Sequence, residues 1–230
     1  MKTIGLIVGM SWESTVEYYR VINQEVSRRL GGLHSAKVLM YSVDFGEIEG
    51  LMRQGRWEGI GGHVAKIAKT IESAGADVIL LCTNTVHKVA SWIESAIKVP
   101  FIHIADVTGE EISRMGLKKV GLLGTRYTME ADFYKNRLTE KFGLSVLIPP
   151  DEKRGMINDV IFMELCQGII KQSSKDQFKE VIKELVARGT EGIILGCTEI
   201  PMLIKEGDCP VPLFDTTSIH ALRAVDYALG

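Results

Sequence analysis

The chain has 230 residues, of which 46% are hydrophobic and 24% are charged, as is typical of globular proteins. A formal net charge of −2 without a basic stripe argues against nucleic acid as a main partner, and no apolar run reaches the ~20 residues that span a bilayer. We therefore expect a cytoplasmic protein with no membrane partner. Its first residues read as a strand rather than a signal peptide, because no small-residue cleavage site follows them.

Strands and helices alternate along the first half of the chain. Strands are expected over residues 3–8, 36–43, 78–81 and 101–104, and helices over residues 14–30, 57–73 and 86–96. In the first helix, the expected inner face consists of Val16, Tyr19, Ile22 and Val26. The polar stretch between the second strand and the second helix, with Glu47, Arg53 and Arg56, is interpreted as a loop.

The second half of the chain repeats this order. Strands are expected over residues 120–124, 146–148, 192–195 and 213–214, and helices over residues 129–142, 153–168, 174–188 and 218–227. Such alternation indicates an α/β fold with parallel sheets.

Matching residues recur at nearly constant distances along the chain. The pairs Gly5/Gly121 and Tyr18/Tyr134 are 116 positions apart, and the pairs Gly75/Gly189 and Asp77/Glu191 are 114 positions apart. Two widely separated anchors with similar offsets favour an internal duplication. We expect an N-terminal half of residues 1–100 plus 211–230, a C-terminal half of residues 101–210, and an active site in the cleft between them.

Residues 74–85 and 188–199 are the most alike of these repeated stretches. Each has a turn glycine, an acidic residue, a short apolar run and a polar tip with cysteine and threonine. Parallel α/β proteins place their chemistry at such strand ends. The offset of 114 sets Cys197 opposite Thr83 rather than Cys82, and side chains alternate in direction along a strand. Cys82 is therefore interpreted as a core residue.

The four cysteines (Cys82, Cys166, Cys197, Cys209) suggest neither a disulfide framework nor a metal site. Cys166 is expected in the core and Cys209 in a loop. Cys197 precedes an expected helix start, which would lower the pKa of its thiol.

Three kinds of chemistry are considered for the polar ends of residues 74–85 and 188–199. A cysteine hydrolase needs a histidine base, for which His87, His103 and His220 are candidates. Dinucleotide binding at Gly5 and Gly9 lacks the full glycine pattern. Proton transfer on two faces of one carbon, as in racemisation, suits a cleft with matched walls.

Five motifs together give the chain a resemblance to a known superfamily. They are Gly9-Met-Ser-Trp-Glu-Ser14, Thr83-Asn-Thr-Val-His87, Gly124-Thr-Arg-Tyr-Thr-Met129, Gly196-Cys-Thr-Glu199 and Asp215-Thr-Thr-Ser-Ile-His220. Over essentially its full length the chain resembles the aspartate/glutamate racemase superfamily. The resemblance implies PLP-independent enzymes that need no cofactor, have two pseudo-symmetric flavodoxin-like halves, are often homodimers and use a pair of cysteines.

The resemblance also implies roles for individual residues. Cys197 is the main acid/base, and Met10 lines the cleft. The residues expected to hold the α-carboxylate of the substrate are Asn84, Thr85, Thr125, Thr128 and Thr198.

Departures from the superfamily pattern shape the expected activity. Thr83 stands where the usual Cys-Asn-Thr motif has its first cysteine, and a hydroxyl is a far weaker acid than a thiol. This resembles a threonine-containing branch that acts on L-aspartate and L-glutamate, so we expect a racemase biased toward the L-isomer. Val8 replaces an expected glycine. Glu164 replaces a lysine that binds the side-chain carboxylate of the substrate in some aspartate racemases, and it is a candidate contact for the substrate ammonium. Arg53 and Arg56 are alternative cationic partners for the side-chain carboxylate of the substrate.

Two other functions stay open at this point. A decarboxylase or isomerase of the same superfamily needs only one thiol, which Cys197 supplies. A non-catalytic amino-acid-binding protein needs no reactive thiol at all.

Overall fold

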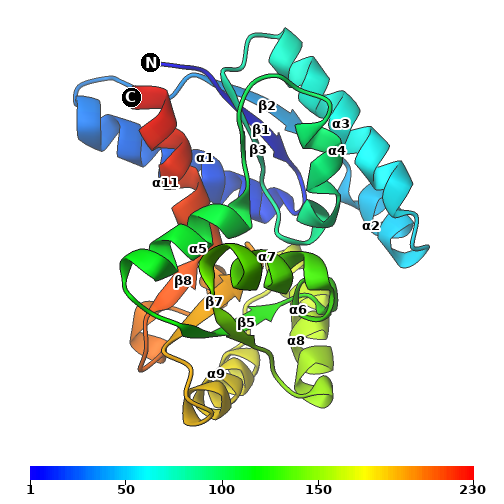
Figure 1. Cartoon of the computed structure of the whole chain (residues 1–230), viewed down its shortest axis with the longest axis vertical. Helices are drawn as coiled ribbons and strands as arrows, with labels where there is room; N and C mark the ends of the chain where they lie inside the picture. The colour runs from blue at the N-terminus through cyan, green and yellow to red at the C-terminus, as the bar shows by residue number, and fades with distance from the viewer. The chain divides into compact units, whose positions relative to one another are not determined.

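Two four-stranded parallel sheets form the framework of the protein, with strand orders β2-β1-β3-β4 and β6-β5-β7-β8 (Figure 1). The computed structural model describes all 230 residues, and they divide into two units. Unit 1 contains Met1–Ile104 and His220–Gly230, and unit 2 contains Ala105–Ile219. The α/β fold with parallel sheets expected from the sequence is confirmed.

Unit 1 is built from one sheet and the helices that cover it. Its strands are β1 (Ile4–Val8), β2 (Val38–Ser42), β3 (Val78–Leu81) and β4 (Phe101–Ile102). Its helices are α1 (Trp12–Leu30), α2 (Phe45–Arg53), α3 (Trp57–Ser73), the 3₁₀ turn η1 (Thr85–Val89) and α4 (Ala90–Glu94). The last helix, α11 (Thr216–Leu229), begins in unit 2 and continues into unit 1, where it lies beside α1 (Figure 1).

The inner face of α1 differs from the expected one. Tyr18, Ile22 and Val26 join the buried core, but Val16 and Tyr19 are about half exposed. The reason is the position of α11, whose small residues pack against the same core and shift the buried arc of α1 toward the Tyr18 side.

The prediction of a loop before α3 is also wrong, because helix α2 occupies most of that stretch. Asp44 caps α2 by accepting a hydrogen bond from the Gly46 N–H at 2.9 Å. Arg53 ends this helix and forms an ion pair with Glu49 at 2.6 Å. Its guanidinium is therefore engaged one turn back along its own helix.

Unit 2 repeats the architecture of unit 1. Its strands are β5 (Lys119–Gly124), β6 (Ser145–Leu147), β7 (Gly192–Gly196) and β8 (Leu213–Asp215). Its helices are α5 (Ile104–Arg114), α6 (Arg126–Glu130), α7 (Asp132–Phe142), α8 (Asp151–Met163), α9 (Gln172–Ala187) and α10 (Ile200–Leu203), with 3₁₀ turns η2 (Leu165–Gln167) and η3 (Glu206–Asp208).

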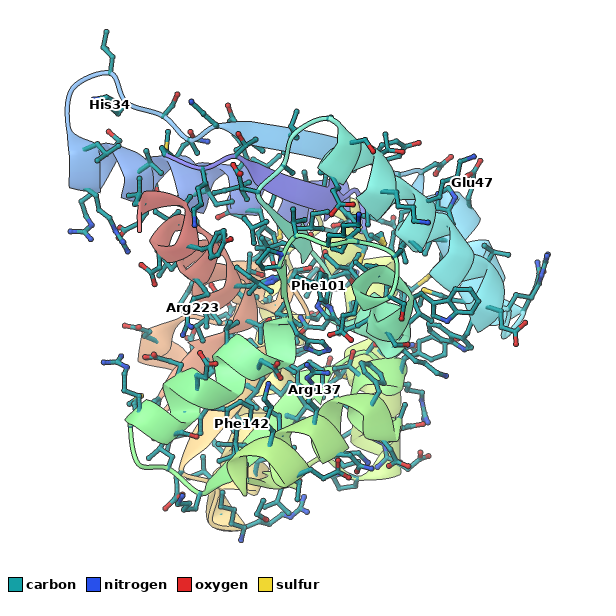
Figure 2. All side chains as sticks on the ribbon, turned by 45° about the horizontal axis from the view of Figure 1, so that its top comes forward. His34, Glu47, Phe101, Arg137, Phe142 and Arg223 are labelled. Atoms are coloured by element: carbon teal, nitrogen blue, oxygen red, sulfur yellow. The ribbon has the colours of Figure 1, made fainter.

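Helix α5 was not expected from the sequence, and it is held against α7. Arg137 of α7 donates to both carboxylate oxygens of Asp106 at 2.5 and 2.8 Å, and Figure 2 shows Arg137 between the two helices. Gly109 carries no side chain where the ring of Phe142 packs. The ion pair and the close approach therefore join α5 to α7, and α5 also buries the apolar residues Ile104, Ala105, Val107 and Ile112.

The strand registers of the two sheets preserve the offsets seen in the sequence. Ile4 pairs with Val78 in unit 1, and Val120 pairs with Gly192 in unit 2. Ile4 and Val120 are again 116 positions apart, and Val78 and Gly192 are again 114 positions apart. Counting outward along β3 and β7, Thr83 and Cys197 occupy the same position in their own sheets.

The repeated glycine and acidic residues have structural roles. Gly75 and Gly189 have positive φ angles of 100° and 86°, which favour glycine at the turn into each strand. Asp77 accepts from the Thr3 N–H at 2.6 Å, and Glu191 accepts from the Lys119 N–H at 2.8 Å. Each carboxylate thus ties its strand to the start of the neighbouring one. None of the helices combines the length and the hydropathy that crossing a membrane requires.

Candidate active site

The polar tip of unit 1 lies at the carboxyl end of β3. Thr83, Asn84 and Thr85 are all buried there, and Met10 is buried after the adjacent strand β1. Gly9 makes this turn possible, because it has a φ angle of +97° and a Cβ atom would lie 2.5 Å from the Val43 carbonyl oxygen. Four of the expected site residues therefore share one edge of one sheet.

The residues that precede this tip belong to the core. Val8 and Cys82 lie in the hydrophobic cluster formed by β1, β3, α1 and α11. Burial raises the pKa of the Cys82 thiol well above its usual range. The interpretation of Cys82 as a core residue is confirmed, and Val8 packs in the same core.

Two of the three candidate histidine bases already use both ring nitrogens. His87 Nδ1 lies 2.6 Å from the Thr83 carbonyl oxygen, and its Nε2 lies 3.2 Å from the Ile104 N–H. His220 contacts the Tyr18 hydroxyl at 2.9 Å and the Ile102 carbonyl at 2.8 Å. Neither ring has a nitrogen left to activate a thiol, so the structure does not support a cysteine hydrolase that uses His87 or His220.

The polar tip of unit 2 carries a buried thiol and carboxylate pair. The Cys197 thiol donates to Oε2 of Glu199 at 2.9 Å, and the Thr198 hydroxyl donates to the same oxygen at 2.9 Å. All three residues are buried. Glu199 was not among the expected site residues, although its place in Gly196-Cys-Thr-Glu199 was the signal that could have identified it. The pair gives Cys197 a proton acceptor of its own.

The expectation of a lowered pKa for Cys197 is wrong. Burial is the largest cause that raises the pKa of this thiol well above its usual range, and the negative charge of Glu199 and the nearby thiol of Cys166 add to it. The helix that follows, α10, has a single turn. The resting form of Cys197 is therefore a neutral thiol that is hydrogen-bonded to the Glu199 side chain.

Thr125 and Thr128 lie at the end of the adjacent strand. Thr125 caps α6 by accepting from the Thr128 N–H at 3.2 Å, and the two hydroxyl oxygens are 3.3 Å apart. Gly124 pairs with Gly196 across the sheet, and a Cβ atom on Gly124 would lie 2.7 Å from the Gly196 carbonyl oxygen. The two glycines let Thr128 approach the strand end that carries Cys197.

Glu164 is engaged elsewhere in unit 2. It follows the end of α8, where its carboxylate binds the Ser174 hydroxyl at 2.6 Å and Lys171 Nζ at 3.1 Å. The hydrogen bond from Ser174 and the contact with Lys171 lower its pKa. No contact brings it to Cys197. Two residues later, Cys166 is only partly buried in η2 rather than in the core, and it influences Cys197 electrostatically.

Comparisons with known proteins agree on one family. A model of the Asp/Glu/hydantoin racemase family matches residues 7–224. The chain is 27% identical over 167 residues to the broad-specificity amino-acid racemase RacX of Bacillus subtilis (strain 168), which covers 71% of this chain and 70% of RacX.

Two crystal structures resemble the whole chain. One, from Yersinia pestis, is of a protein proposed to be an Asp/Glu racemase, with 55% identity and a TM-score of 0.93. Another is of an aspartate racemase homologue from Pyrococcus horikoshii OT3, with 38% identity and a TM-score of 0.85. In both cases the match covers 100% of each chain.

Proposed function

The chain belongs to the Asp/Glu/hydantoin racemase family, and on this premise we propose that it is an amino-acid racemase that acts on aspartate or glutamate without a cofactor. The observation that carries the proposal is the buried Cys197–Glu199 pair, at the strand position that register relates to Thr83. A racemase needs one proton-transfer group on each face of the α-carbon. Cys197 and Thr83 are these groups in the proposal.

The reaction from the L-isomer begins at Cys197. Glu199 takes the thiol proton, and the thiolate sulfur takes the α-proton of the substrate, so that a thiol, a protonated Glu199 and a planar carbanion result. The raised pKa of Cys197 makes its thiolate a strong base once it forms. The geometry that supports this step is the 2.9 Å contact between Cys197 Sγ and Glu199 Oε2.

Inversion requires a proton on the other face of the carbanion. The Thr83 hydroxyl donates it, water reprotonates the resulting alkoxide, and the hydroxide so formed takes the proton from Glu199 and restores its carboxylate. The Thr83 hydroxyl is a far weaker acid than a thiol, whereas the Cys197 thiol has the Glu199 carboxylate 2.9 Å away. The Thr83 step is therefore the slow one. In this proposal the α-carboxylate is held by Asn84, Thr85, Thr125, Thr128 and Thr198, with Thr198 offering its backbone N–H because its hydroxyl donates to Glu199.

The expected L-bias takes a particular form. Because the two enantiomers have equal free energy, kcat/KM for inversion must be the same in both directions. The difference between Cys197 and Thr83 instead appears in the ratio of two rates, namely return of the carbanion to the starting isomer and its inversion to the other isomer. From the L-isomer, Cys197 returns a proton many times before Thr83 delivers one.

The test is incubation of L- and D-aspartate and L- and D-glutamate in heavy water, with NMR and chiral chromatography as readouts. We expect loss of the α-proton and appearance of the opposite enantiomer with at least one of the two amino acids. Binding of these amino acids with neither exchange nor inversion would contradict the proposal and favour an amino-acid-binding protein.

The single thiol and base pair also favours a second candidate function. A decarboxylase acts on a substrate whose carbanion forms by loss of carbon dioxide, and it needs one group to protonate that carbanion. Cys197 alone would suffice. Release of carbon dioxide from a malonate-type substrate, with no exchange on amino acids, would support this function in place of racemisation.

A further inference from the structure

Unit 1 contains a cluster of buried rings next to Thr83. The His87 and His103 ring centroids are 4.4 Å apart, and His87 is 6.1 Å from His220. Phe101 of β4, labelled in Figure 2, packs against His87 with a centroid distance of 5.6 Å. Three buried histidines in one core need a reason, because each must satisfy two ring nitrogens away from water.

The hydrogen bonds of His87 define its tautomer. The Ile104 N–H can only donate, so His87 Nε2 accepts and carries no hydrogen. The Thr83 carbonyl can only accept, so His87 Nδ1 carries the hydrogen and donates it. His87 is thus a neutral ring that joins the carbonyl of Thr83 to the first N–H of α5.

His220 has the opposite tautomer. Its Nε2–H donates to the Ile102 carbonyl, and its Nδ1 accepts from the Tyr18 hydroxyl. Burial lowers the pKa of His220 to about 4, so this ring is neutral as well.

His87 and His220 lie at the two points where the chain passes from one unit to the other. The passages are at Ile104–Ala105 and at Ile219–His220. His87 binds the backbone of Ile104, and His220 is itself the first residue after the second passage. Of the two rings, only His87 also binds the residue that the proposed function places against substrate.

We propose that His87 is a positioning residue, which joins the carbonyl of Thr83 to the N–H of Ile104 and so fixes the backbone that carries the Thr83 side chain. This inference rests on the proposed function of Thr83. The peptide unit between Thr83 and Asn84 is planar, so a fixed carbonyl oxygen fixes the Asn84 N–H as well. One hydrogen bond therefore fixes the backbone position from which the proton donor extends and orients a backbone donor for the substrate carboxylate.

Two substitutions separate the two bonds of His87. In His87→Asn, the side-chain NH₂ can replace Nδ1–H and keep the bond to Thr83, but nothing reaches Ile104. In His87→Gln, the longer side chain can place its oxygen near Nε2 and keep the bond to Ile104, but nothing binds Thr83. Both variants lose one hydrogen bond and the packing of the ring, so they serve as matched controls for each other.

The experiment measures kcat and KM for inversion in the wild type and in both variants, with the amount of folded enzyme set by circular dichroism. We expect His87→Gln to lower kcat by about tenfold or more with little change in KM, because misplacement of a reacting group by about 1 Å can cost 10²-fold. We expect His87→Asn to keep kcat within about threefold of the wild type while lowering the melting temperature. Equal losses of kcat in the two variants, or no loss in His87→Gln, would overturn the inference.

A second readout separates this inference from the proposed function. Long-range ¹H–¹⁵N spectra of the histidine rings report the tautomer without any turnover. A neutral Nδ1–H ring at His87 is the expected result, and an Nε2–H or doubly protonated ring would overturn the inference. Absence of exchange and inversion in the wild type would instead contradict the proposed function, whatever the spectra show.

Discussion

The strand ends of unit 1 and unit 2 have the same backbone register, but different side chains occupy the matching positions. At the end of unit 1, Val8 and Cys82 put their side chains into the core. At the matching positions of unit 2, Gly124 and Gly196 leave room for Thr128. Thr83 is held through its carbonyl by a histidine, whereas Cys197 is held through its thiol by a carboxylate. The tip of unit 1 is thus held through its backbone, and the tip of unit 2 holds a thiol against a carboxylate.

The largest effect should follow removal of the thiol. In Cys197→Ser the hydroxyl is a much weaker acid, so we expect α-proton exchange from the L-isomer to fall on the order of 10³-fold. The measurement is exchange in heavy water, with melting temperature as the control for folding. Retention of more than a tenth of the exchange rate would show that Cys197 is not the base on this face.

Removal of the Glu199 carboxylate should change the pKa of the Cys197 thiol and the rate of α-proton exchange in ways that can be measured separately. Glu199 raises the pKa of Cys197 by its charge and by accepting the thiol hydrogen bond, so Glu199→Gln should lower that pKa. The pH profile of thiol alkylation should move to lower pH, while exchange falls by about 10²-fold because the thiol has lost its base. An alkylation profile that moves to higher pH, or an unchanged exchange rate, would contradict the role of Glu199.

A thiol in unit 1 would make the two ends alike. Thr83→Cys should raise the rate of inversion by about tenfold, because a thiol of pKa about 8.5 donates a proton far more readily than a hydroxyl. Exchange from the L-isomer should then exceed inversion by a smaller factor than in the wild type. Chiral analysis of product against deuterium content checks this. Slower inversion, with the folded fraction unchanged, would mean that Thr83 does not face the substrate.

The smallest effect should come from the glycine pair. A methyl group on Gly124 meets backbone of Gly196, so Gly124→Ala should destabilise the protein by about 1–3 kcal/mol. Gly50→Ala is the matched control, since no atom lies within 4 Å of its Cβ position in α2, and it should stabilise the helix by about 0.5–1 kcal/mol. Chemical denaturation measures both. Equal effects of the two changes would show that the close approach at Gly124 is not needed.

Much of the fold could be predicted from the sequence, because short apolar runs between turn glycines mark buried parallel strands. Strand β3 and helix α3 have the expected bounds. Helix α2 was missed because its two glycines and its charges resemble a loop, and α5 because Gly109 and the β-branched Val107 and Thr108 have low helix propensity.

The site was predictable to a smaller extent, since its chemistry depends on contacts. The offset of 114 placed Thr83 and Cys197 at matching positions, and the strand registers give the same relation. The direction of the Cys197 pKa was wrong, because the sequence shows a helix start but not the burial or the direction of the Glu199 carboxylate. The sequence does not show that Glu164 binds Lys171, which precedes α9, and Ser174, which lies in its first turn.

The most direct test of unequal strand ends is the position of deuterium after partial reaction in heavy water, starting separately from L- and D-glutamate or the corresponding aspartates. We predict that unreacted L-isomer gains α-deuterium before D-product accumulates. We also predict that unreacted D-isomer keeps its α-proton while deuterated L-product forms. Equal deuterium content in the two unreacted isomers, at equal extents of inversion, would contradict this account.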